Sequence, residues 1–96
     1  MALYVILDNE VHDQEKYDTY KAAVPAIVAR HGGEYLARDG DFQVLAGDWN
    51  PNRIVLFRWP SREALDAFQS DPEYQPWKEL RESVTTTRNL MVFEGV

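Results

Sequence analysis

The stretch ALYVIL at residues 2–7 is short, apolar and rich in β-branched and aromatic residues, a composition that predicts a β-strand. The polar residues that follow at 8–10 are expected to end it. Successive side chains of a strand point to opposite faces of the sheet, and both sets are apolar here. Residues 54–57, IVLF, show the same two-sided pattern. The sequence therefore predicts a sheet that needs cover on both faces.

The remaining patterns place helices and further strands around these two runs. Apolar residues at steps of three and four predict a helix between Asp13, a suitable N-cap, and the stop signal Gly32-Gly33, with a bend at Pro25. Further strands are predicted over residues 34–38, 53–59 and 87–93. A turn is predicted over residues 39–41, after which residues 42–46 continue the sheet, and a loop over residues 47–52. Two more helices are predicted to begin at Ser61 and at the capping-box pair Ser70 and Glu73. The order β-α-β-β-α-β, with a split second helix, predicts an α+β fold of the ferredoxin-like type, an antiparallel sheet with the helices on one face.

Length and composition narrow the classes of function. The 96 residues fit a single domain over residues 1–96. The absence of cysteine excludes disulfides, iron–sulfur clusters, thiolate zinc sites and cysteine nucleophiles. The formal charge of −6, from 16 acidic and 10 basic residues, argues against nucleic acid as a partner. The sequence shows no signal-peptide pattern and no membrane-spanning stretch, so we expect a cytoplasmic protein without a membrane partner.

The second face of the sheet needs a partner surface. Two or three short helices can cover only one face, and a domain of this size has a marginal core of its own. We therefore expect a homodimer in which a second copy covers the other face. The alternative is a monomer with one loosely covered face.

Several short motifs have an order and spacing that are specific in combination. They are Tyr4-Val5-Ile6, the pair Tyr17 and Tyr20 before Val24-Pro25, His31-Gly32-Gly33, Gly47-Asp48-Trp49 followed by Arg53, Pro60-Ser61, the run from Ser70 to Tyr74, and Arg88. Together they resemble the family called domain of unknown function 1330 over about residues 2–94. The resemblance implies a dimeric α+β barrel, in which two ferredoxin-like sheets pack face to face. It implies no single activity, because the family has none agreed and the wider superfamily includes cofactor-independent monooxygenases, isomerase-like proteins, haem enzymes and ligand-sensing regulators.

Two residues are candidates for proton transfer. His31 lies in the last turn of the first predicted helix, and an imidazole suits general acid or base catalysis near neutral pH. Tyr20 lies about three turns earlier on the same helix stripe. The structural alternatives are a histidine that caps its helix and a tyrosine that belongs to the core.

Four further residues are candidates for ligand binding. Arg88 and Arg53 each begin a strand and share a face with apolar residues, where an arginine needs an anionic partner. That partner is either a ligand carboxylate or enolate, or a carboxylate of the protein itself. Trp49 in its loop either covers a pocket or plugs the sheet edge, and Tyr74 either points its hydroxyl into a pocket or packs in the core.

We predict no metal site and no cofactor site. Asp8, Glu10, His12 and Asp13 form an acidic group, but their spacing matches no calcium or zinc signature. Two hypotheses of function remain. The first is an enzyme that acts on a compact, anionic or aromatic organic molecule between sheet and helices, as a cofactor-independent isomerase, decarboxylase or monooxygenase. The second is a non-catalytic module that binds or senses such a molecule.

Overall fold

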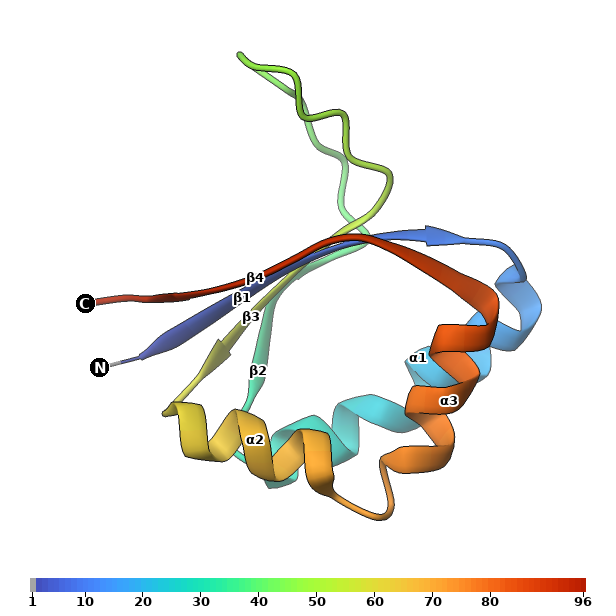
Figure 1. The fold of residues 1–96 in the computed structure, drawn as a ribbon, viewed down its shortest axis with the longest axis vertical. Helices are drawn as coiled ribbons and strands as arrows, with labels where there is room; N and C mark the ends of the chain where they lie inside the picture. Colours follow the sequence, from blue (N-terminus) through green and yellow to red (C-terminus); the bar gives the residue numbers. More distant parts are fainter. Residues whose placement is uncertain (1) are drawn as a thin grey trace.

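The computed structural model describes residues 2–96 (Figure 1). In chain order its elements are β1 (Leu3–Val11), α1 (Gln14–Arg30), β2 (Glu34–Arg38), β3 (Ile54–Trp59), α2 (Arg62–Ser70), α3 (Gln75–Val84) and β4 (Thr85–Glu94). The four strands form one antiparallel sheet in the order β2-β3-β1-β4. Figure 1 shows the three helices on one side of this sheet. The predicted ferredoxin-like α+β fold is confirmed, including the split of the second helix into α2 and α3.

Side-chain caps begin two of the helices. Asp13 caps α1 and Ser61 caps α2, as predicted, each through a 3.1 Å hydrogen bond from a backbone N–H three residues further on. The predicted capping box at the third helix is wrong. α2 continues through Ser70, whose hydroxyl donates to the carbonyl of Asp66, and α3 begins after Tyr74 without a side-chain cap.

Two segments differ from the sequence prediction because strand pairing decides them. β1 runs on through residues 8–10 to Val11, since these residues pair with β4. The prediction that residues 42–46 continue the sheet is wrong. They belong to residues 39–53, called the arm below, which have no regular secondary structure. The arm begins at Asp39, whose left-handed φ of 62° turns the chain away, and Figure 1 shows it in green on the side of the sheet away from the helices.

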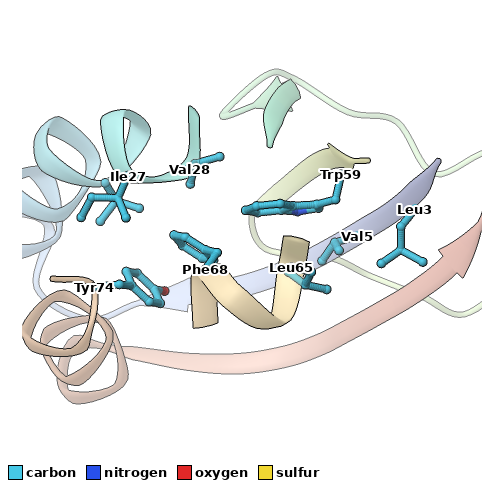
Figure 2. Close-up of a cluster of buried hydrophobic side chains, with 9 residues drawn as sticks. Leu3, Val5, Ile27, Val28, Trp59, Leu65, Phe68 and Tyr74 are labelled. Carbon is cyan, nitrogen blue, oxygen red and sulfur yellow. The ribbon is translucent and has the colours of Figure 1, made fainter. Parts of the chain in front are cut away.

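The core lies between the sheet and the helices (Figure 2). Its buried residues come from β1, β3, α1, α2 and the turn before α3: Leu3, Val5, Val24, Ile27, Val28, Trp59, Leu65, Phe68 and Tyr74. The ring centroids of Trp59 and Phe68 are 5.1 Å apart. Burial of these side chains is the main force that holds the helices against this face.

Gly33 is the position where the core leaves no room for a side chain. An added Cβ would lie 2.7 Å from Trp59 Cζ3 and 2.8 Å from Val28 Cγ1, and both of these residues are only 1% exposed. We expect Gly33→Ala to lower the free energy of unfolding, measured by urea denaturation, by about 1–3 kcal/mol. Gly40→Ala is the control, because nothing lies within 4 Å of its added Cβ. Equal losses in the two variants would contradict the packing explanation.

The opposite face of the sheet, called the open face below, is apolar and is not covered by helices. Ile6 lies opposite Leu56 on one side and Met91 on the other, and Tyr4 lies opposite Phe93. Met91 and Phe93 are 52% and 41% exposed. The two-sided apolar pattern of the strands thus gives one face packed on helices and one apolar face without helices over it.

Candidate functional site

A small cavity lies in the layer between the sheet and the helices. Ten residues line it: Val5, Leu7, Phe57, Trp59, Leu65, Phe68, Gln69, Tyr74, Arg81 and Leu90. Most of its wall is aromatic or aliphatic, and only four of these side chains bring polar atoms. Its volume of about 40 Å³ is enough for one water molecule.

Two tyrosine hydroxyls meet beside this cavity. Tyr20 comes from α1 and Tyr74 from the turn before α3, and their hydroxyl oxygens lie 2.8 Å apart. Burial raises the pKa of both phenols above the ordinary value of 10.0, while the positive charge of Arg81 acts on both pKa values in the opposite direction. Both side chains are therefore neutral at neutral pH. They can donate hydrogen bonds or a proton, but they cannot serve as bases.

Arg81 on α3 brings a positive charge to the cavity wall. Among residues 2–96 it forms no salt bridge, and its Nε is buried without a hydrogen-bond partner. The indole Nε1 of Trp59 on β3 is also buried and unpartnered within the described chain. A buried donor without an acceptor costs roughly 1–3 kcal/mol.

Of the predicted site residues, the structure brings Tyr20 and Tyr74 together and places His31 elsewhere. His31 Nε2 lies 2.8 Å from Asp71 Oδ2, which also accepts from Arg30 at 2.6 Å. The hydrogen bond from His31 and those from the Glu73 backbone and Arg30 hold the pKa of the Asp71 carboxyl well below its usual range. His31 does not line the cavity. It connects the end of α1 to the turn between α2 and α3.

Arg53 and Arg88 each meet a carboxylate of the protein. Arg53 Nε lies 2.5 Å from Asp39 Oδ1, and its guanidinium stacks over the Tyr17 ring at 4.7 Å. Arg88 pairs with Glu10. Neither arginine lines the cavity. For both, the structure shows the internal salt bridge that the sequence leaves as one of two alternatives.

Trp49 lies on the open face, where it closes over a buried carboxylate. Its Nε1 donates to Asp8 Oδ2 at 3.0 Å, and Asp8 Oδ1 accepts the backbone N–H groups of Asn52 and Arg53 at 2.9 and 3.2 Å. Asp8 is 1% exposed. Burial acts to raise the pKa of Asp8, but these hydrogen bonds outweigh it and hold that pKa below its usual value. Asp8 therefore anchors the arm to the sheet.

The acidic group at residues 8–13 is dispersed in the structure. Asp8 holds the arm, Glu10 pairs with Arg88, and Asp13 caps α1. Among residues 2–96, no three histidine, aspartate or glutamate side chains are grouped so that they could hold a metal ion. Over the same range, no helix has both the length and the apolar character that a membrane span requires.

Sequence reasoning missed Arg81, although a signal for it exists. Arg81 follows Tyr74 by seven residues and Trp77 by four, so it is in phase with the apolar stripe of α3. An arginine in such a stripe needs an anionic partner, as we argued for Arg88. The lack of an internal partner, which distinguishes Arg81 from Arg88, becomes visible only in the structure.

Comparison with known proteins agrees with this fold. Residues 2–96 match the sequence profile of the family described as domain of unknown function (DUF1330). The chain belongs to the DUF1330 family. The resemblance seen in the sequence motifs is thereby confirmed. No curated protein matches this DUF1330 chain significantly.

Solved structures similar to this DUF1330 protein share its fold at low sequence identity. RPA0582 from Rhodopseudomonas palustris, a protein of unknown function, is 16% identical with a TM-score of 0.80, over 99% of this chain and 82% of that one. SnoaB from Streptomyces nogalater, described as a cofactor-independent oxygenase, is 16% identical with a TM-score of 0.69, over 99% and 93% of the two chains. Rv0793 from Mycobacterium tuberculosis is 20% identical with a TM-score of 0.57, over 100% and 96%. At these identities the likeness establishes the fold alone.

Proposed function

We propose that this DUF1330 protein binds a compact organic anion with an aromatic part in the cavity between its sheet and its helices. The observation that carries the proposal is Arg81, whose Nε is buried and unpartnered among the described residues in the wall of an aromatic cavity. A mostly apolar cavity with a few convergent polar groups is the common form of a small-molecule site. Arg81 would meet the negative charge of the ligand, while Tyr74 donates a hydrogen bond to the ligand and accepts one from Tyr20.

The walls of the cavity favour a flat ring. The ring centroids of Trp59 and Phe68 are 5.1 Å apart, and those of Phe68 and Tyr74 are 4.1 Å apart, so aromatic surfaces follow one another along the wall. The cavity of about 40 Å³ is smaller than such a ligand. Binding therefore requires side chains at its edge to turn outward. We propose that Leu90, which lines the cavity and is 55% exposed, is one of these side chains.

We further propose that the open face packs on the open face of a second copy. Its apolar side chains include Met91 and Phe93, and large contiguous apolar patches are rare on monomeric soluble proteins. The arm adds Phe42, Val44 and Leu45, which are 47%, 44% and 87% exposed.

A cofactor-independent reaction at the same cavity is the second candidate function. The hydrogen bond between Tyr20 and Tyr74 favours it, because a neutral phenol near an arginine can protonate a developing enolate. A decarboxylation would use such a step, because loss of carbon dioxide leaves the enolate carbon to which the phenol then gives its proton. The fold likeness to SnoaB, described as a cofactor-independent oxygenase, supports the same general class by analogy. Binding without a reaction remains the first candidate function, because His31, the candidate base, lies outside the cavity and contacts Asp71.

Arg81→Leu tests the proposed ligand site. We expect salicylate, used as a flat aromatic carboxylate probe, to bind the wild type and to bind the variant at least about tenfold more weakly, in titrations of tryptophan fluorescence. The variant should fold normally, because Arg81 has no salt bridge to lose within residues 2–96. Circular dichroism checks this point.

Arg62→Leu is the matched control for that experiment. Arg62 lies on α2 and pairs with Asp66 at 3.0 Å in an exposed position, so its loss removes the same charge away from the cavity. Salicylate affinity should stay unchanged in this variant. Failure of salicylate to bind the wild type, or equal affinities in wild type and Arg81→Leu, would overturn the proposed site.

A further inference from the structure

A second, smaller cavity lies next to the one that carries the proposed ligand site. Leu7 and Phe57 line both cavities, and the second has a volume of about 10 Å³. Six further residues complete its wall: Tyr17, Tyr20, Lys21, Tyr35, Arg38 and Val55. We infer that Phe57 separates the two cavities and thereby limits the ligand to a single aromatic ring. This inference rests on the ligand site at Arg81 proposed above.

The ring of Phe57 stands next to one residue of each cavity. Its centroid is 4.7 Å from that of Tyr35, which lines only the second cavity. It is 6.2 Å from that of Trp59, which lines only the first. Leu7, the other shared residue, comes from the neighbouring strand β1. One layer of side chains, called the partition below, therefore separates the two cavities.

The pair of tyrosine hydroxyls shows independently that the two cavities are adjacent. Tyr20 lines only the second cavity and Tyr74 only the first, yet their hydroxyl oxygens lie 2.8 Å apart. Phe57 takes part in the same boundary with an apolar ring that makes no hydrogen bond. Leu7 is 6% exposed, whereas Phe57 is only half-buried. Phe57 is therefore the member of the partition that can change with the least damage to the fold.

The partition decides how long a bound molecule can be. Three tyrosines line the second cavity, and their ring faces would suit a further aromatic ring. A ligand with its negative charge at Arg81 and two fused rings would have to displace Phe57 to reach that space. Forcing extra ring atoms into a packed core destabilises the complex. The inference thus narrows the ligand class to aromatic anions with one ring.

Isothermal titration calorimetry with two matched probes tests the inference. Salicylate has one ring, and 3-hydroxy-2-naphthoate is the same molecule with one more fused ring. We expect the wild type to bind the naphthoate at least about tenfold more weakly than salicylate. Phe57→Ala joins the two cavities and frees the space of a phenyl group, so this variant should bind the naphthoate at least as tightly as salicylate. The ratio of the two dissociation constants should therefore shift at least about tenfold.

Phe57→Leu provides the same test in a variant that keeps an apolar side chain in the core. It should fold even where Phe57→Ala is too unstable, and it should shift the ratio in the same direction. Val55→Ala is the control, because Val55 lines only the second cavity. Its truncation enlarges that cavity but leaves the partition in place, so the ratio should stay at the wild-type value.

The ratio of dissociation constants also separates a role in specificity from a purely structural one. A purely structural residue would lower the melting temperature when it is replaced and leave the ratio unchanged. An unchanged ratio in the folded Phe57 variants, an equal shift in Val55→Ala, or equal affinities of the wild type for both probes would overturn the inference alone. Absence of salicylate binding to the wild type would overturn the ligand site at Arg81 and the inference with it, so the two failures are distinguishable.

Discussion

Asp8→Ala is expected to lower the free energy of unfolding by about 2–4 kcal/mol and to release the arm from the sheet. The carboxylate of Asp8 accepts three hydrogen bonds, from the indole of Trp49 and from two backbone N–H groups of the arm. Alanine leaves these donors without an acceptor at a position that is 1% exposed in the wild type. Urea denaturation measures the loss. Chymotrypsin, which cleaves after Phe42, Leu45 or Trp49, should cut the released arm faster.

Asp8→Asn is the matched variant, because it keeps the size and one acceptor oxygen. We expect a smaller loss of unfolding free energy than in Asp8→Ala. The backbone N–H groups of Asn52 and Arg53 can keep their acceptor oxygen, whereas the indole N–H of Trp49 loses its charged acceptor. Wild-type stability and wild-type rates of arm cleavage in Asp8→Ala would show that Asp8 does not anchor the arm.

The same anchor predicts a pH dependence. The pKa of Asp8 in the folded protein lies below the ordinary 3.8, so the unfolded chain takes up the proton more readily. Its contribution to stability is therefore complete above about pH 4 and is lost as the pH falls through the lower folded pKa. The difference in unfolding free energy between wild type and Asp8→Asn should shrink over that acidic range. A difference in unfolding free energy that does not change with pH would contradict the assignment of this pH dependence to Asp8.

Met91→Glu is expected to convert the proposed dimer into a monomer with an intact fold. Met91 lies on the open face opposite Ile6 and is 52% exposed in the single chain, so a glutamate there does not disturb the core. In a face-to-face dimer the same side chain would be buried, and an unpaired buried carboxylate costs several kcal/mol. Light scattering after size exclusion should show a dissociation constant raised by about a hundredfold or more.

Ala67→Glu is the control for the dimer experiment. Ala67 is exposed on α2, so the substitution adds the same charge on the helical side of the molecule. It should leave the assembly unchanged. A wild-type protein that is monomeric at all concentrations, or a Met91→Glu variant that stays dimeric, would contradict a contact through the open face.

The fold could be predicted from the sequence because its signals are local. The two-sided apolar runs at residues 2–7 and 54–57 mark β1 and β3, and the caps Asp13 and Ser61 mark the starts of α1 and α2. Pairing between distant strands was not predictable in this way. It carries β1 to Val11 through polar residues, whereas residues 42–46, which look like a strand, lie in the arm.

The candidate site was only partly predictable for the same reason. Tyr20 and Tyr74 share apolar helical stripes with the core, and the structure brings their hydroxyls within 2.8 Å. Arg88 and Arg81 have similar sequence patterns. Glu10 lies beside Arg88 because β1 and β4 are neighbours, whereas Arg81 forms no salt bridge within residues 2–96. Which arginine is left to meet a ligand depends on such long-range contacts.

Native mass spectrometry of the freshly purified wild type, with Arg81→Leu in parallel, tests the dimer and the ligand site together. We expect a two-chain species that carries extra mass, loses that mass on denaturation, and lacks it in Arg81→Leu. A wild-type monomer, or an extra mass retained unchanged in Arg81→Leu, would contradict the proposal of a dimer that holds an organic anion at Arg81.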